Sequence, residues 1–180
     1  MTTDQLQQNA LDRAEIFFRT DDIRSAIEVL ETESVNSANN LALLETAAQC
    51  YWRLGNFQHL EPILRKMVSI HPYEPSYFAM LGAVLQSEGR IGEAIRSFEI
   101  ADRMYDGENE SIRLALATAI DYQNELIQSL GESDQQFRVS LRKSPTLTLI
   151  QYGFHPVENS QPTVLAPPGS THLSLSARPS

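Results

Sequence analysis

The chain has 180 residues, of which 42% are hydrophobic, and this is enough for one domain with a substantial core. Its formal net charge of −9 argues against nucleic acid or an anionic membrane as the main partner. A single cysteine, Cys50, excludes an internal disulfide framework and fits a reducing compartment.

The first residues are polar and lack the basic and apolar regions of a signal peptide. No apolar run approaches the roughly 18 residues that would span a bilayer. We therefore expect a cytoplasmic protein that does not insert into a membrane.

Three consecutive units repeat one pattern, at about residues 7–40, 41–74 and 75–108. Small residues recur at Ala14, Ala48 and Gly82, and turn-forming residues recur at Asp21, Gly55 and Gly89. Bulky apolar residues recur at three further equivalent positions of the units. These positions hold Phe17, Tyr51 and Leu85; Ile23, Phe57 and Ile91; and Leu30, Leu64 and Phe98. The equivalent residues are 34 positions apart. A fixed period of this length indicates an architecture of stacked repeats, because one unit cannot bury its apolar face alone.

Each unit is predicted to form two helices joined by a turn. In the third unit the first helix is expected over residues 75–87, because Pro75 suits a first helical turn and Gly89 supplies the positive φ that ends a helix. The second helix of the second unit contains Pro62, and an interior proline costs about 3 kcal/mol. We expect this helix to start late, with Pro62 in its first turn, or to bend there.

After the repeats, residues 109–143 are predicted to form capping helices that complete a domain spanning 1–143. The first is one long helix, with an inner stripe of Ile112, Leu116, Ala119, Ile120 and Leu126, and a shorter helix follows over 134–143. Residues 144–180 are rich in Pro, Ser and Thr and are expected to be a flexible tail. Within that tail, residues 147–154 are too apolar for an ordinary linker.

The repeat pattern resembles the tetratricopeptide repeat (TPR). The third unit matches the family spacing at Phe78, Leu81, Gly82, Leu85, Ala94, Phe98 and Ala101, whereas the first departs from it at Arg13 and Glu33. The resemblance implies an all-α, right-handed superhelical solenoid of three helix-turn-helix repeats with a C-terminal capping helix. It also implies a protein-binding role, because the first helices of TPR units line a concave groove.

Mapped onto this sequence, the groove has ten candidate partner-binding residues. They are Leu11, Glu15 and Phe18 in the first unit, Glu45, Gln49, Trp52 and Arg53 in the second, and Ala79, Ala83 and Gln86 in the third. Trp52 and Phe18 are the expected anchors, although Trp52 could equally cover the edge of the core. The Lys/Asn/Arg clamp of some family members is missing, so the groove is predicted to suit an extended or helical peptide.

A narrower resemblance concerns residues 72–106, which are similar to the class II chaperones of bacterial type III secretion. It implies a cytoplasmic chaperone that shields a segment of an exported translocator and dimerises through its N-terminal helices. Residues 162–167, PTVLAP, have the form of the cargo motif of that family, and we hypothesise that this tail segment occupies its own groove. The alternative is a general scaffold that brings proteins together.

The sequence contains no recognisable catalytic constellation. His59, His71, His155 and His172 lie far apart, and none has a metal-ligand spacing with Cys50. The glycines of EGRIGEA belong to a helix turn rather than to a phosphate loop. We therefore expect no enzymatic activity, no cofactor, no metal and no nucleic-acid partner.

Overall fold

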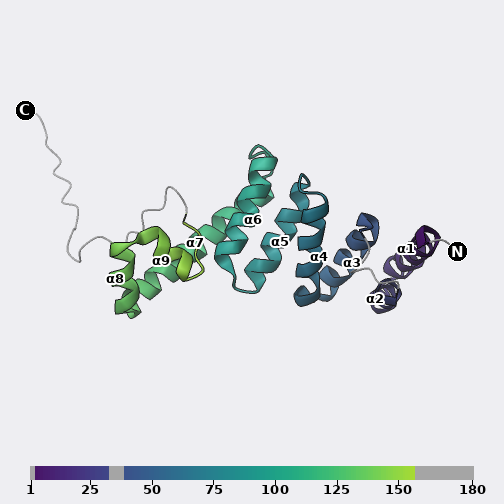
Figure 1. Cartoon of the computed structure of the whole chain (residues 1–180), viewed down its shortest axis with the longest axis horizontal. Coiled ribbons are helices and arrows are strands. Elements are labelled where there is room, and N and C mark those ends of the chain that lie inside the picture. Colours follow the sequence, from purple (N-terminus) through teal and green to yellow (C-terminus); the bar gives the residue numbers. More distant parts are fainter. Residues whose placement is uncertain (1–2, 33–38, 157–180) are drawn as a thin grey trace, which may run out of the picture.

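The computed structural model describes residues 3–32 and 39–156, and all regular elements in these ranges are α-helices. The helices are α1 (Thr3–Arg19), α2 (Ile23–Thr32), α3 (Leu41–Leu54), α4 (Phe57–Ile70), α5 (Pro75–Ser87), α6 (Ile91–Met104), α7 (Glu110–Ser133), α8 (Gln135–Lys143) and α9 (Pro145–Gln151). Each helix packs against the next, and α1 also packs against α3. The result is an elongated row with α1 and α2 at one end and α8 and α9 at the other (Figure 1). The predicted all-α repeat solenoid is confirmed.

The turns inside the three repeats fall at the predicted positions. Asp21, Gly55 and Gly89 have φ values of 62°, 65° and 76°. A left-handed residue at this point lets the chain leave one helix and enter the next after two or three residues. The predicted bounds of α5 are also confirmed, with Pro75 at its start.

The small residues at equivalent positions of the units let the two helices of a repeat approach closely. Ala14, Ala48 and Gly82 are all buried. A Cβ atom on Gly82 would lie 2.7 Å from the nearest ring carbon of Phe98. The ring of Phe98, 3% exposed, therefore occupies the space that a side chain at residue 82 would need.

Pro62 lies inside α4, which begins at Phe57. The predicted late start of this helix is therefore wrong, and a bend at Pro62 stays a prediction. Proline removes the hydrogen bond to the carbonyl of Gln58, one turn earlier. Both residues are exposed, so water can bond that carbonyl, which lowers the cost of the proline.

An ion-pair network joins the second repeat to the third. Glu61 of α4 pairs with Arg65 on its own helix and with Arg90 at the start of α6, each at 2.7 Å. Glu93 of α6 accepts from both arginines, at 2.8 Å from Arg90 and 3.1 Å from Arg65. Burial acts to raise the pKa of Glu61, but the hydrogen bonds from Arg65 and Arg90 outweigh it and hold this pKa below its usual value.

Glu61→Gln is expected to lower the free energy of unfolding by about 1 kcal/mol at pH 7, because charge-assisted hydrogen bonds become neutral ones. Since the folded-state pKa of Glu61 is depressed, its contribution is complete above the unfolded-state pKa and is lost as pH falls through the folded value. Urea unfolding at several pH values should therefore show a difference from the parent chain that shrinks in acid. Glu125→Gln, at an exposed position of α7, is the control and should change little. A difference that stays constant with pH would contradict this role for Glu61.

The helices after the repeats cover the end of the solenoid largely as predicted. In α7, Ile112 and Ala119 are buried, and Leu116, Ile120 and Leu126 are half-buried. The shorter helix α8 follows after Asp134, whose side chain accepts hydrogen bonds from the backbone N–H groups of Gln136 and Phe137. The inner face of α7 also contains Gln123, a polar residue that is 1% exposed and was not predicted there.

The flexible tail was expected from residue 144, and this boundary is wrong for residues 145–156. Helix α9 occupies 145–151, and Leu149 and Phe154 pack in a second apolar cluster with Ile127, Phe137 and Leu141. This explains the apolar character of residues 147–154. The hypothesised groove-binding segment at 162–167 lies outside the described residues.

Residues 152–156 form a strap that returns from α9 to α6 and α7. The buried amide of Gln123 donates to the carbonyl of His155 at 2.8 Å and accepts from its N–H at 2.7 Å. The imidazole Nε2 of His155 lies 2.9 Å from a carboxylate oxygen of Glu99 on α6. The strap backbone also rests directly on Gly92, where a Cβ would lie 2.2 Å from the carbonyl oxygen of Gly153. Side-chain and backbone contacts thus fix the chain as far as His155.

Candidate partner-binding groove

A groove of about 390 Å³ runs between α1 and α3. Its walls are Leu11, Glu15, Phe18 and Arg19 from α1 and Ala42, Glu45, Thr46 and Gln49 from α3. On α1, Leu11, Glu15 and Phe18 are three or four positions apart, and on α3 the same holds for Ala42, Glu45 and Gln49, so each set shares one helix face. The two first helices of neighbouring repeats therefore provide a continuous surface with apolar and polar side chains.

The structure brings five of the ten predicted residues together in this groove. They are Leu11, Glu15, Phe18, Glu45 and Gln49. The mapping succeeded for these positions because the 34-residue register places equivalent residues on equivalent helix faces. Whether they bind a partner stays a prediction.

Sequence reasoning missed Arg19, Ala42 and Thr46, which also line the groove. Each lies three or four positions from a predicted residue on the same helix, or directly beside one. Helical spacing from Glu15, Glu45 and Gln49 could have found them.

Arg53 lies at the edge of the groove through its contact with Phe18. Its guanidinium carbon is 4.4 Å from the centre of the Phe18 ring, a cation–π geometry. The same guanidinium pairs with Asp21 at 3.0 Å. Arg53 therefore holds the ring of Phe18 in place from one side.

Trp52 is 42% exposed but is not among the residues that line the groove. Its ring makes an edge contact with Phe57 at the start of α4, with 5.9 Å between ring centroids. This contact favours the alternative in which Trp52 covers the edge of the core. Its predicted role as an anchor for a partner stays untested.

Ala79, Ala83 and Gln86 lie on α5, one repeat further along the row, and do not line the α1–α3 groove. All three are half-buried, and Ala83 packs against the core. Their predicted contact with a partner would require a segment long enough to continue from α3 to α5.

Glu45 connects the groove to α5, because it accepts a hydrogen bond from the hydroxyl of Tyr77. Burial raises the pKa of Tyr77, and the hydrogen bond to Glu45 raises it further. The phenol therefore remains protonated and serves as a neutral donor. Elsewhere in the groove, Glu15 pairs with Arg19 at 3.3 Å.

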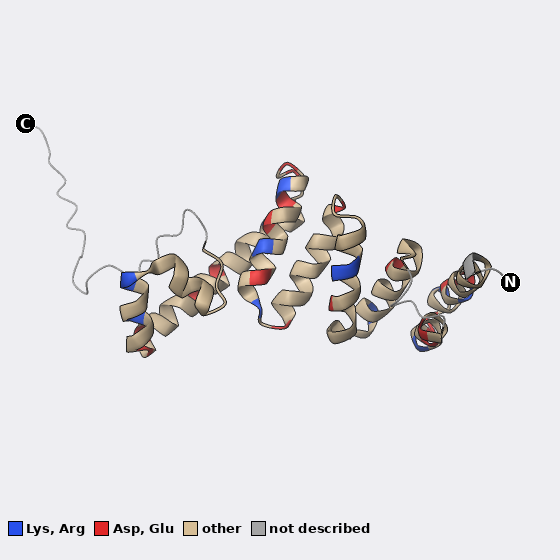
Figure 2. Cartoon of the chain, in the orientation of Figure 1, with Lys and Arg blue, Asp and Glu red and all other residues tan. Residues whose placement is uncertain are grey.

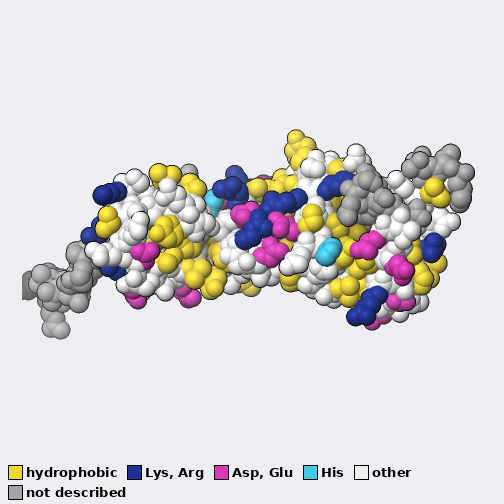
Figure 3. Space-filling view, turned by 60° about the horizontal axis from the view of Figure 1, so that its bottom comes forward, with side chains coloured by type: hydrophobic (Ala, Val, Ile, Leu, Met, Phe, Trp, Pro, Cys, Tyr) yellow, Lys and Arg dark blue, Asp and Glu magenta, His cyan; other side chains and the backbone are white. Residues whose placement is uncertain are grey.

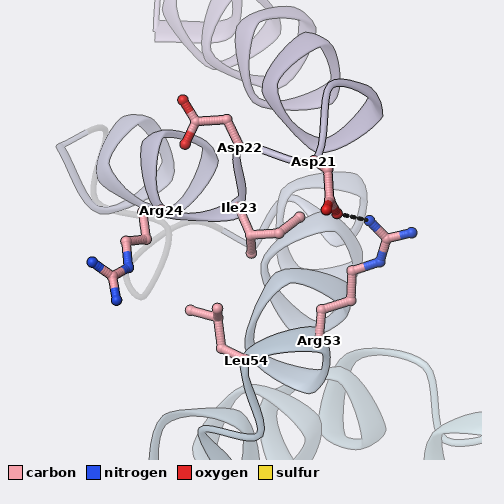
Figure 4. A pocket seen from close by; sticks show the side chains of 6 residues that line it. All are labelled: Asp21, Asp22, Ile23, Arg24, Arg53 and Leu54. Carbon is pink, nitrogen blue, oxygen red and sulfur yellow. Dashed lines mark hydrogen bonds and ion pairs between the residues drawn. The ribbon is translucent and has the colours of Figure 1, made fainter.

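A second hollow, of about 430 Å³, lies where the turns of the first two repeats meet (Figure 4). It is lined by Asp21, Asp22, Ile23, Arg24, Arg53 and Leu54. Its charges have local roles: Asp21 pairs with Arg53, and Asp22 accepts from the backbone N–H of Ser25 in α2. Hydrogen bonds from Ser25 lower the pKa of Asp22. These contacts stabilise the turn and assemble no reactive group.

Charged side chains are interspersed along the helices (Figure 2). The face in Figure 3 likewise mixes basic, acidic and hydrophobic side chains and has no extended basic surface.

In the described ranges, no cluster of His, Cys, Asp and Glu could hold a metal ion, and no helix is long and apolar enough to cross a membrane. Burial raises the pKa of the Cys50 thiol to about 11, which keeps it protonated and a poor nucleophile.

No family model matches the chain, and no curated protein matches it. Solved structures are similar in fold. A structure of MamA AMB-1 matches with a TM-score of 0.59 and 23% identity over 63% of this chain, which spans only 61% of the MamA chain. Another MamA crystal structure matches with a TM-score of 0.58 and 16% identity over 83% of this chain and 78% of that one.

A third similar structure is the first TPR of Spaghetti (RPAP3) bound to the HSP90 peptide SRMEEVD. It has a TM-score of 0.57 and 17% identity and covers 66% of this chain and 93% of that one. These likenesses show a shared fold, the TPR-type helical repeat, and confirm the architecture implied by the repeat pattern.

Proposed function

We propose that this chain is a non-enzymatic protein-binding module that holds an extended or helical segment of a partner protein in the α1–α3 groove. The main support for this proposal is that five predicted residues line the same groove, although they were predicted separately in two different repeats. The peptide-bound RPAP3 structure, which shares the fold, supports the same class of function.

The groove has a composition suited to peptide binding. Leu11 and Phe18 offer apolar surface to a partner side chain, at roughly 25 cal/mol for each Å² removed from water. Thr46 and Gln49 offer hydrogen-bonding groups that would orient the segment. The Arg53 contact holds Phe18 in position before the partner arrives, which reduces the entropy cost of binding.

A narrower form of this proposal is a cytoplasmic chaperone of type III secretion, which would shield a segment of an exported translocator and could dimerise through its N-terminal helices. It is supported by the resemblance of residues 72–106 and by the net charge of −9. The alternative is a general scaffold. Co-expression separates the two, because a chaperone keeps its partner soluble, whereas a scaffold leaves the solubility of its partners unchanged.

The groove is tested by affinity purification with Phe18→Ala, followed by quantitative mass spectrometry. We expect the bound partner to decrease at least tenfold, because truncating a central aromatic residue commonly costs more than about 1–2 kcal/mol of binding. Ile16→Ala is the matched control: Ile16 lies on the same helix, is 61% exposed and lies outside the groove.

Because Phe18 also packs against the core, Gln49→Arg provides a second variant at an exposed groove position. It should likewise weaken capture while leaving the thermal midpoint close to that of the parent. Equal capture by the parent, Phe18→Ala and Gln49→Arg chains would overturn the proposal.

A further inference from the structure

The charged side chains of the groove differ in whether they have ion-pair partners. This difference indicates what kind of partner segment the groove binds. The lining contains two carboxylates, Glu15 and Glu45, and one cation, Arg19. Arg19 already pairs with Glu15. Arg53 at the edge pairs with Asp21 and stacks on Phe18. Both nearby guanidinium groups therefore have other carboxylate partners.

Among the residues that the structure describes, Glu45 is the groove carboxylate that has no cation partner. Within residues 3–32 and 39–156, its hydrogen-bond partner is the neutral hydroxyl of Tyr77, and no Lys, Arg or His side chain forms an ion pair with it. Glu45 is also half-buried, unlike the exposed Glu15. A cation brought to a partly buried, uncompensated carboxylate gains more than one added to an exposed pair.

We propose that the groove selects a partner segment with an apolar side chain close to a lysine or arginine, the apolar side chain packing between Leu11 and Phe18 and the cation pairing with Glu45. This inference rests on the proposed function. The net charge of −1 in the lining and of −9 in the chain disfavours an acidic segment by the same electrostatics.

Helix geometry sets the length of the partner segment that covers Leu11 and Phe18. Leu11 and Phe18 are seven residues apart on α1, which corresponds to about 10 Å along the helix. An extended segment covers that length in about three residues. The part of an extended segment that lies over Leu11 and Phe18 is therefore about three residues long.

The test is selection of random 12-residue peptides displayed on phage against the whole chain, followed by binding of the enriched peptides to variants. Glu45→Gln keeps a side-chain oxygen for Tyr77 and removes only the charge. Enriched peptides should share an apolar residue next to Lys or Arg, should bind Glu45→Gln at least tenfold more weakly, and should lose affinity as salt rises. Glu125→Gln, the same change at an exposed carboxylate of α7 that does not line the groove, should alter binding less than threefold.

The outcomes separate this inference from the proposed function. If the enriched peptides bind Glu45→Gln as tightly as the parent, but lose affinity for Gln49→Arg, the groove is the site and the cation preference is wrong. If neither variant weakens binding, or if no peptide is enriched, both proposals are overturned. Enriched peptides without a basic residue would also overturn the cation preference.

Discussion

Gly82→Ala is expected to destabilise the protein by about 1–3 kcal/mol, although alanine normally favours a helix over glycine. The new Cβ would lie 2.7, 2.8 and 3.0 Å from three ring carbons of Phe98. That ring is almost fully buried between α5 and α6, so it cannot move without disturbing the packing around it. For a chain of this size the thermal midpoint should fall by several degrees.

A double-mutant cycle with Phe98→Leu identifies the cause. Leucine at residue 98 creates space that the methyl group added at residue 82 can partly fill, so the double variant should be more stable than the sum of the two single changes predicts. Urea unfolding of the four chains measures this coupling. Strict additivity, or a Gly82→Ala chain as stable as the parent, would show that the close contact with Phe98 does not fix the helix pair.

This contact also shows why the fold could be predicted from sequence. A small residue, a turn residue and a bulky apolar residue recur 34 positions apart, and each has a local physical reason that holds in every repeat. Gly55 and Gly89 adopt positive φ where the pattern requires a turn. The residues that favour the helices and turns locally are also the residues that the stacking of the repeats requires. The 34-residue period was therefore enough to locate most of the helices.

The groove was partly predictable for the same reason, and Trp52 marks where the reasoning fails. Trp52 lies seven positions after Glu45, which predicts the same face of α3. It belongs to the last turn of that helix, however, and Phe57 of the next helix is close enough to contact its ring. The repeat register predicts which face of a helix a residue occupies. It does not predict a contact with the next helix across a turn, because that contact depends on tertiary packing.

The strap could not be predicted, because its partners have no common spacing. Glu99 and Gln123 lie on different helices, and a glutamine within an apolar stripe lowers the periodic signal instead of strengthening it. The only sequence signal was the apolar run at 147–154. Composition indicated that this run would be buried somewhere, but it could not indicate against which helix.

Gly92→Ala is expected to detach the strap and to leave the repeats folded. The added Cβ would lie 2.2 Å from the carbonyl oxygen of Gly153, 2.8 Å from the carbonyl carbon of Phe154 and 2.9 Å from the amide nitrogen of His155. All three are backbone atoms, so the strap as a whole must move. Gln123 would then lose both of its hydrogen bonds to His155, and because water can reach the uncovered amide, each lost bond costs about 0.5–1.5 kcal/mol.

Amide hydrogen exchange followed by NMR measures this release residue by residue. The His155 N–H, which donates to Gln123, should lose its protection in Gly92→Ala, while the amides of α3 and α4 keep theirs. Gln123→Leu should produce the same loss without adding an atom at residue 92, and Gln128→Ala, at an exposed position of α7, is the control. A protected His155 amide in both Gly92→Ala and Gln123→Leu would mean that the apolar packing of Phe154, rather than these backbone contacts, holds the strap in place.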